Sequence, residues 1–249
     1  MIKSYEEFSV LGLPIHVATD YPGYLLERLQ QRMGTHVVTL NAEMTMQAER
    51  NETLATIIKA ADLVIPDGAG IVLYLRLFLK QDVRRIPGIE LAEALLHEIG
   101  QNSPDSTVFF YGGKPSTAAA AAQFWQGQIP NLNIVGTHSG YHSPEEEILL
   151  HSTLAKMQPQ VIYVGLGVPR QELWIKQNRH LCPQATWVGV GGSFDIWSGA
   201  KTRAPAWLGD NNLEWLYRLY QEPWRWRRML ALPKFAFKAL IYGVKTKGA

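Results

Sequence analysis

The sequence is poor in the residues that build disulfides and metal centres. Its 249 residues include one cysteine, Cys182, which excludes an internal disulfide and a cysteine-rich metal site and makes a reducing compartment the expected one. No two aspartates are spaced as Asp-x-Asp. His138 and His142 straddle a Gly-Tyr turn, so we interpret them as loop residues and not as a metal-binding pair on a helix. We therefore expect a reaction that needs no metal and no other cofactor.

Sequence motifs of several common enzyme classes are missing as well. There is no Gly-x-Gly-x-x-Gly turn and no Walker A pattern, which argues against a dinucleotide-dependent oxidoreductase and a P-loop enzyme. There is no Gly-x-Ser-x-Gly nucleophile elbow. No run approaches the ~20 apolar residues that span a bilayer, and the opening MIKSYEEFSV lacks the apolar segment of a secretory signal. These absences predict a chain without a membrane span or a leader.

The small net charge of +2 conceals an uneven distribution. Residues 1–199 hold 14 Lys and Arg against 19 Asp and Glu, a net charge of −5, whereas residues 200–249 hold 10 against 3, a net charge of +7. Four of the eight tryptophans also lie in this last part: Trp207, Trp215, Trp224 and Trp226. The asymmetry predicts an anionic partner for the C-terminal fifth of the chain.

Short apolar runs alternate with helical segments up to about residue 199, which predicts a doubly wound α/β sheet. The expected strands lie near 37–38, 63–65, 108–111, 134–136, 161–164 and 187–190, after an edge hairpin at 7–18. The expected helices are 21–33, 42–61, 70–79, 89–99, 116–125, 144–156 and 171–179, and Asn51 can cap a helix that begins at Glu52. Residues 200–249 are expected to form a helical appendage, with helices near 206–208, 213–221, 224–230 and 234–242.

The stretch 36–68 predicts a parallel βαβ unit with polar residues at the ends of both strands. The first strand ends in Thr39 and Asn41, and the second ends in Pro66-Asp67-Gly68. Ligands of open parallel sheets bind at the carboxyl ends of the strands. These three polar side chains are therefore expected on one rim of the sheet, and Asp67 is the charged residue of that rim.

Three later strand ends carry glycine, which lets the backbone approach a ligand closely. The predicted nucleotide- or phosphate-binding residues are Gly112, Gly113, Gly165, Gly167, Gly191 and Gly192. Gln171 follows one of these turns. We interpret it either as a side chain that forms a hydrogen bond with the ligand or as a surface residue. Glu172 is interpreted as a helix N-terminal charge, and Asp195 as a helix cap or a ligand.

In the appendage, Arg218, Arg225 and Arg228 are spaced to share one helical face, if the helix continues past Pro223. Arginine binds diphosphate groups through two parallel hydrogen bonds, and tryptophan favours membrane interfaces. No nucleic-acid-binding motif accompanies these residues, so nucleic acid is not an expected partner. A packed, solvated helical subdomain is the alternative interpretation.

Five motifs, in order, resemble the WecG/TagA/CpsF glycosyltransferase family over about residues 10–235. They are TLN at 39–41, ADLVIPDG at 61–68, GLGVPRQE at 165–172, GGSFD at 191–195 and EWLYR at 214–218. The resemblance implies a bacterial, metal-independent, inverting transferase with a Rossmann-like fold. Departures from the usual family residues at Glu90, Val168, Arg170 and Ser193 leave the donor sugar open.

The resemblance also implies roles for individual residues. Asp67 would be the general base, and the substrate-binding residues would be Thr39, Asn41, Arg85, Gln171, Arg218, Arg225 and Arg228. The implied partners are a UDP-sugar donor (N-acetylmannosamine or its uronate), a polyprenyl-diphosphate-linked sugar acceptor, and the inner face of the plasma membrane, which a cytoplasmic protein would reach through its appendage. Homo-oligomers are common in the family.

Two further interpretations stay open. A non-catalytic scaffold could dock on anionic membranes through the basic tail, in which case no nucleotide binds and Asp67 is dispensable. A diverged, inactive relative could bind nucleotide without transferring a sugar. A thermal shift that depends on UDP separates the scaffold from the enzyme.

Overall fold

The computed structural model describes residues 5–210 and 213–247 and confirms the predicted α/β fold class. A six-stranded sheet has the order β4-β3-β8-β7-β5-β6, and every neighbouring pair is parallel. Its strands are β3 Thr35–Leu40, β4 Leu63–Pro66, β5 Thr107–Gly112, β6 Asn133–His138, β7 Val161–Gly165 and β8 Thr186–Gly189. Strands β3, β7 and β8 are buried along their whole length, as strands covered by helices on both faces are, and β3 buries Thr35, His36 and Thr39 together with its apolar residues.

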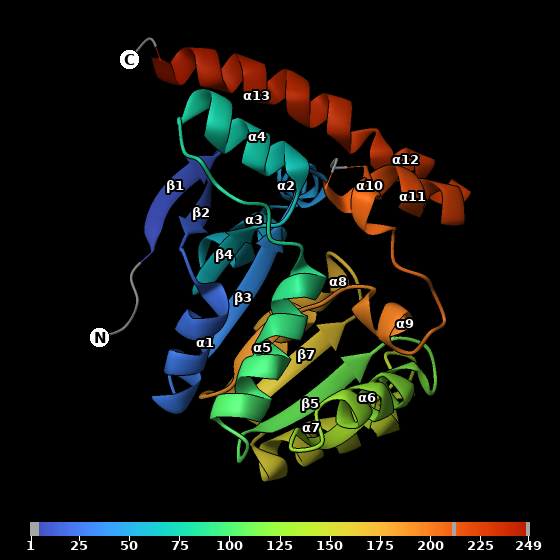
Figure 1. Cartoon of the computed structure of the whole chain (residues 1–249). Helices are drawn as coiled ribbons and strands as arrows, with labels where there is room; N and C mark the ends of the chain where they lie inside the picture. Colours follow the sequence, from blue (N-terminus) through green and yellow to red (C-terminus); the bar gives the residue numbers. More distant parts are fainter. Residues whose placement is uncertain (1–4, 211–212, 248–249) are drawn as a thin grey trace.

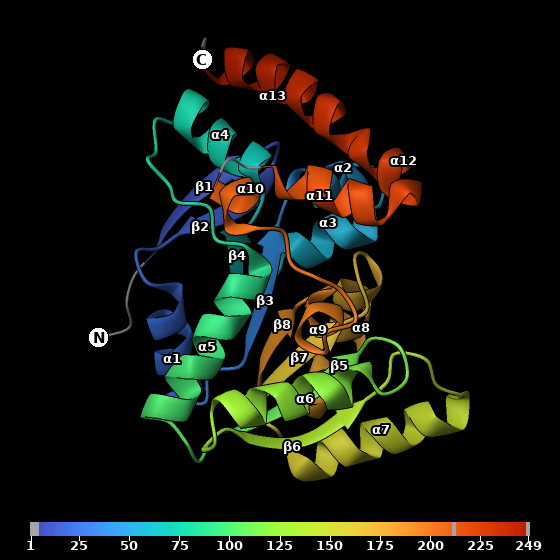
Figure 2. The ribbon, with the colours of Figure 1, turned by 45° about the vertical axis from the view of Figure 1, so that its right-hand side comes forward.

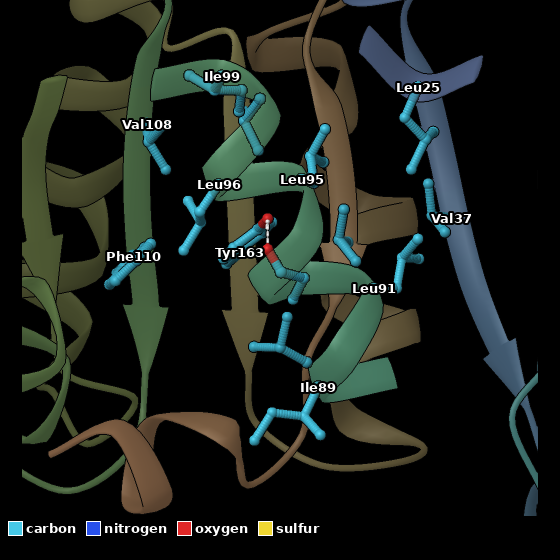
Figure 3. Packing of buried hydrophobic residues seen from close by; sticks show 14 of the residues in the cluster. Leu25, Val37, Ile89, Leu91, Leu95, Leu96, Ile99, Val108, Phe110 and Tyr163 are labelled. Atoms are coloured by element: carbon cyan, nitrogen blue, oxygen red, sulfur yellow. Dashed lines mark hydrogen bonds between the residues drawn. The ribbon is translucent and has the colours of Figure 1, made fainter. Parts of the chain in front are cut away.

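Four helices cover one face of the sheet: α1 Tyr21–Gln30, α5 Gly88–Asn102, α6 Thr117–Gln128 and α9 Ser193–Trp197. Their apolar side chains pack with alternate residues of the strands into the largest core cluster. Figure 3 shows this packing around α5, where Leu96 lies beside Phe110 and Tyr163 and Leu91 lies on the side of Val37. The buried Tyr163 hydroxyl donates to the carbonyl oxygen of Ala92 at 2.8 Å, so the polar end of this core residue is satisfied.

Further helices pack on the opposite face: α2 Ala42–Ala48, α3 Glu52–Lys59, α4 Ala69–Phe78, α7 Pro144–Met157 and α8 Arg170–Asn178. The helical stretch expected over 42–61 forms two helices, the first of which ends at Ala48, and the second begins at Glu52 as predicted. The predicted cap is confirmed: the Asn51 side chain accepts a hydrogen bond from the backbone N–H of Leu54 at 3.0 Å. The cap satisfies a donor of the new helix, so one helical stretch becomes two short helices.

The predicted hairpin forms from β1 Glu6–Val10 and β2 Leu13–Val17, which pair with each other as a separate antiparallel sheet. It lies beside the edge strand β4. The buried ring of His16 accepts a hydrogen bond from the backbone N–H of Val64 at 3.0 Å. A side chain thus satisfies an edge N–H that no neighbouring strand reaches.

The chain after Ser198 crosses to the carboxyl end of the sheet and forms the helical appendage (Figures 1 and 2). It comprises α10 Ala206–Asp210, α11 Glu214–Gln221, a 3₁₀ turn η2 Pro223–Arg225, α12 Trp226–Met229 and α13 Ala231–Lys247. Helix α13 starts earlier than expected because Pro233 fits within its first turn, where no helical N–H bond is lost. In the described residues no helix is long and apolar enough to cross a bilayer.

Candidate functional site

The site begins where β3 and β4 end side by side. Strand pairing places Leu40 opposite Pro66, and the backbone N–H of Asp67 donates to the Leu40 carbonyl at 3.0 Å. Two glycines let neighbouring segments approach this rim: a Cβ at Gly68 would lie 2.9 Å from the Asn41 Cβ, and a Cβ at Gly88 would lie 3.0 Å from the Thr39 hydroxyl oxygen. The rim predicted from strand ends therefore exists, with Asp67 at its centre.

A cavity of about 230 Å³ opens on this rim and extends beneath the appendage. Its floor includes residues that sequence analysis predicted: Thr39, Asn41, Asp67, Gly167, Gln171, Gly191 and Gly192. Its roof comes from the appendage and the strap before it: Lys201, Arg203, Glu214, Tyr217, Arg218 and Arg228. Residues about 150 positions apart in the sequence thus line one space, with a carboxylate on the floor and cations above.

Asp67 is half-buried, and its pKa is raised from an ordinary value of 3.8 to about 6. Burial is the largest cause, because it disfavours the charged carboxylate. The Glu214 carboxylate raises the pKa further, whereas Arg218, Arg85 and a hydrogen bond from the Gly88 backbone lower it. A carboxyl with this pKa is ionised in roughly nine of ten molecules at pH 7 and still accepts a proton readily.

Glu214 organises the cations around Asp67, and sequence analysis missed it as a site residue. Its carboxylate accepts from Arg85 at 3.2 Å and from Arg218 at 2.5 Å. Arg85 belongs to the loop before α5, so the first of these pairs ties the appendage to the sheet domain. The signal was present in the sequence: Glu214 lies four residues before Arg218, a spacing that pairs side chains on a helix.

Gln171 lies at the base of the cavity and is held by a buried chain of hydrogen bonds. Its amide oxygen accepts from the Gly191 backbone N–H at 3.1 Å, and its amide nitrogen donates to Glu172 at 3.0 Å. The other Glu172 oxygen lies 2.8 Å from His36 Nε2, and both side chains are almost fully buried. Glu172 lies in the first turn of α8, as interpreted from the sequence, but it is buried there and its partner comes from β3, 136 residues away.

Asn41 has a second role in addition to lining the cavity. Its side-chain oxygen accepts from the Met44 backbone N–H at 3.0 Å and caps α2. The interpretation of Asp195 as a helix cap is wrong: it lies inside the first turn of α9 and pairs with Lys201 at 2.8 Å. Lys201 also bonds Glu222 at 3.1 Å and so joins the start of the appendage to the end of α11.

The predicted glycines divide into two groups. Gly167, Gly191 and Gly192 line the cavity, whereas the described lining does not include Gly112, Gly113 or Gly165. The latter lie at the ends of β5 and β7, where a Cβ at Gly112 would come within 2.5 Å of the Gly165 carbonyl oxygen. Close packing of two strands accounts for the glycine at position 112, and phosphate binding there stays a prediction.

The predicted arginine face does not form as one helix. Helix α11 ends at Gln221, before Pro223, so Arg218 and Arg228 reach the cavity from separate helices. Arg228 is paired with Glu43 of α2 at 2.5 Å. Arg225 lies in the η2 turn, and its side chain is outside the described part of the structure.

Two further observations bear on the chemistry. Within the described ranges, no group of three or more His, Cys, Asp or Glu side chains could hold a metal ion. Burial raises the pKa of the Cys182 thiol to about 11, which suits a structural cysteine and not a nucleophile. Asp67 is a carboxylate of this cavity whose pKa is raised toward neutrality.

Comparison with known proteins gives consistent findings. The sequence profile described as "Glycosyl transferase WecG/TagA/CpsF family" matches residues 8–249. The N-acetylglucosaminyldiphosphoundecaprenol N-acetyl-beta-D-mannosaminyltransferase of Bacillus subtilis (strain 168) is 34% identical over 223 residues, which cover 89% of this chain and 86% of that protein. A protein of the same name from Bacillus spizizenii (strain ATCC 23059 / NRRL B-14472 / W23) is 37% identical over 225 residues, which cover 90% and 83%.

Proposed function

Because the chain belongs to the WecG/TagA/CpsF family of glycosyltransferases, we propose that it moves N-acetylmannosamine, or its uronate, from a UDP-sugar to a sugar on polyprenyl diphosphate. The transfer inverts the anomeric centre and uses no metal. The printed names of the two Bacillus relatives, which specify this sugar and a lipid-diphosphate-linked N-acetylglucosamine, support the choice of substrates. The observation that carries the mechanism is the carboxylate of Asp67, with a pKa raised to about 6, in the cavity between the strand ends and the appendage.

An inverting transfer requires one base. The acceptor hydroxyl gives its proton to the Asp67 carboxylate while its oxygen bonds to the anomeric carbon of the donor sugar. The bond from that carbon to the β-phosphate oxygen breaks on the opposite face, and UDP leaves with the bonding electrons. A base with a pKa one unit below neutral suits this step, since it is ionised yet basic enough to accept the proton.

Without a metal, cationic side chains and backbone N–H groups must stabilise the leaving diphosphate. The roof of the cavity supplies Lys201, Arg203 and Arg218 for this diphosphate. The turn at Gly191 and Gly192 lines the floor without side chains that would hold a phosphate away. Gln171, fixed by Glu172, is assigned to a hydrogen bond with the donor.

The appendage is also proposed to bind the inner face of the plasma membrane, as a peripheral contact. Large side chains on it are exposed: Trp207, Tyr220, Trp224, Trp226 and Phe237. Aromatic and cationic side chains together favour the interface of an anionic bilayer. We also propose that the chain forms a homo-oligomer, in which the exposed Leu73 and Leu77 of α4 supply apolar contact surface.

The test is UDP release from a panel of UDP-sugars, with a soluble prenyl-diphosphate-linked N-acetylglucosamine as acceptor and EDTA present. We expect release that depends on the acceptor and occurs with UDP-N-acetylmannosamine or the corresponding uronate. Release from a different UDP-sugar would change the donor and keep the mechanism. Loss of all activity in EDTA, with recovery on adding Mg²⁺, would contradict the metal-independent mechanism.

A further inference from the structure

Two more cavities continue the functional cavity along helix α2. The middle cavity, of about 300 Å³, shares Glu43 and Arg228 with the functional cavity. The distal cavity, of about 470 Å³, shares Met46, Glu49 and Lys238 with the middle one. Residues of α2 line all three cavities, and residues of α13 line the middle and distal ones. Figures 1 and 2 show α13 running across α2. The shared wall residues place the three cavities in a row that leads away from Asp67, which we call the track.

The chemical character of the track changes in one direction. The middle cavity is lined by two acidic and five basic side chains, the latter being Arg50, Arg227, Arg228, Lys234 and Lys238. The distal cavity is mainly apolar, with Glu49, Lys59 and Lys238 as its charged lining residues. Its apolar walls come from the hairpin, from α2 and α3, and from the second half of α13: Leu11, Leu13, Met46, Ala48, Ala55, Ile241 and Tyr242. From the functional cavity outward, the track therefore presents the Asp67 carboxylate, then the cations of the middle cavity, then the apolar walls of the distal cavity.

We propose that the distal cavity binds the first isoprene units of the prenyl chain of the lipid-linked acceptor. This inference rests on the proposed function, because it takes the acceptor from there. The acceptor is a sugar, then a diphosphate, then a hydrocarbon chain, and the track offers a matching environment for each part in the same order. A water-soluble acceptor would leave the apolar distal walls unused, and a protein partner would not need cations between them and the site.

Two ion pairs mark the boundaries of the track. Arg228 pairs with Glu43 where the functional and middle cavities meet, and Lys238 pairs with Glu49 where the middle and distal cavities meet. All four side chains belong to the lining and are partly exposed. A diphosphate in the middle cavity competes with Glu43 for Arg228, so entry of the acceptor exchanges one anionic partner of this arginine for another.

The test compares geranylgeranyl diphosphate with inorganic pyrophosphate in calorimetric titrations of the full chain, below the aggregation concentration of the lipid. These probes contain no sugar, so the result does not depend on transfer. We expect the prenyl compound to bind at least tenfold more tightly. Ala55→Phe fills the distal cavity and should remove this preference while it leaves pyrophosphate affinity within twofold. Thr56→Phe, which adds the same ring on the exposed face of α3, should leave both affinities unchanged.

A second matched pair removes an apolar wall without filling the cavity. Ile241→Ser should weaken binding of the prenyl compound about threefold or more, and Leu240→Ser, at an exposed neighbour outside the lining, should not. Thermal melting checks that each variant is folded. Equal losses in Ile241→Ser and Leu240→Ser would place the chain on the outer face of α13 and overturn the proposal, as would binding without a prenyl preference. If the prenyl preference holds and no UDP-sugar is used, the proposed function fails and the prenyl site stands.

Discussion

The pKa of Asp67, the proposed base, is raised by burial and adjusted by charged neighbours, and its titration should limit the rate at low pH. With a pKa of about 6 in the free enzyme, kcat/KM should rise about tenfold per pH unit below 6 and level off above pH 7. The measurement is initial rates of acceptor-dependent UDP release between pH 4.5 and 8.5, with checks that the enzyme stays folded. An acid limb centred near pH 4 would mean that Asp67 is fully solvated during the reaction, against this structure.

Glu172 illustrates a residue whose role depends on a partner far along the chain. It is fully buried and bonded to His36, so removing it leaves a buried ring and the Gln171 amide without their partner. Glu172→Ala should lower the free energy of unfolding by about 3–5 kcal/mol and reduce kcat/KM through the displaced Gln171. Urea unfolding provides the first number and initial rates the second.

The chain offers a matched control for that change. Glu147 and His151 form a Glu–His pair at 3.8 Å on α7, but both side chains are partly exposed. Glu147→Ala should lower the free energy of unfolding by about 0.5 kcal/mol or less, because solvent screens the pair. If both variants lost the same stability, the buried pair would have no special role.

At the scale of elements, Glu214 couples helix α11 to the loop that carries Arg85. Glu214→Gln removes the carboxylate that raises the pKa of Asp67 and releases two arginines that lower it. The acid limb of the pH–rate profile should therefore move down by about half a pH unit, and KM should rise roughly tenfold as the roof of the cavity loosens. Glu98→Gln, on the exposed end of α5, is the control and should change neither value.

The elements also show how far the sequence could be read. Every strand of the sheet follows from a short apolar run, and the rim of Thr39, Asn41 and Asp67 follows from where two runs end. Asn51 indicated the start of the second helix at Glu52, whereas the end of the first helix at Ala48 carries no such capping signal. The burial of Glu172 could not be predicted, since the acidic first turn of a helix gives no indication of a buried histidine from β3.

At the scale of the whole molecule, the appendage packs on the sheet domain through α13. Phe235 of α13 is buried against α4 and belongs to the same core cluster as Met44 and Tyr74, whereas Phe237 on the same helix is 66% exposed. Phe235→Ala should destabilise the chain by about 3–5 kcal/mol, and Phe237→Ala by about 0.5 kcal/mol or less. Scanning calorimetry measures both.

The same experiment tests the division into a catalytic domain of residues 1–199 and an appendage of residues 200–249, which stays a prediction. If the appendage folds and unfolds independently of the catalytic domain and merely packs against it, Phe235→Ala should split the melting curve into two transitions. A single shifted transition would show that the two parts unfold together and form one cooperative unit.

The central claim is that Asp67 is kept in an environment that serves catalysis at the expense of stability. Its pKa is raised in the folded chain, so the folded state holds a proton that the unfolded chain has already lost between about pH 3.8 and pH 6. The contribution of this group to stability therefore falls as the pH rises through that window, and above pH 7 the ionised carboxylate costs up to about 3 kcal/mol.

Asp67→Asn is therefore the most direct measurement, made at pH 8 on the same preparation for stability, UDP binding and transfer. We expect a chain that melts at a higher temperature than the unsubstituted protein, binds UDP with similar affinity and loses transfer by about 10²–10⁴-fold, as removal of a general base does. A variant that turns over at a near-normal rate would show that another group takes the proton and would contradict the account.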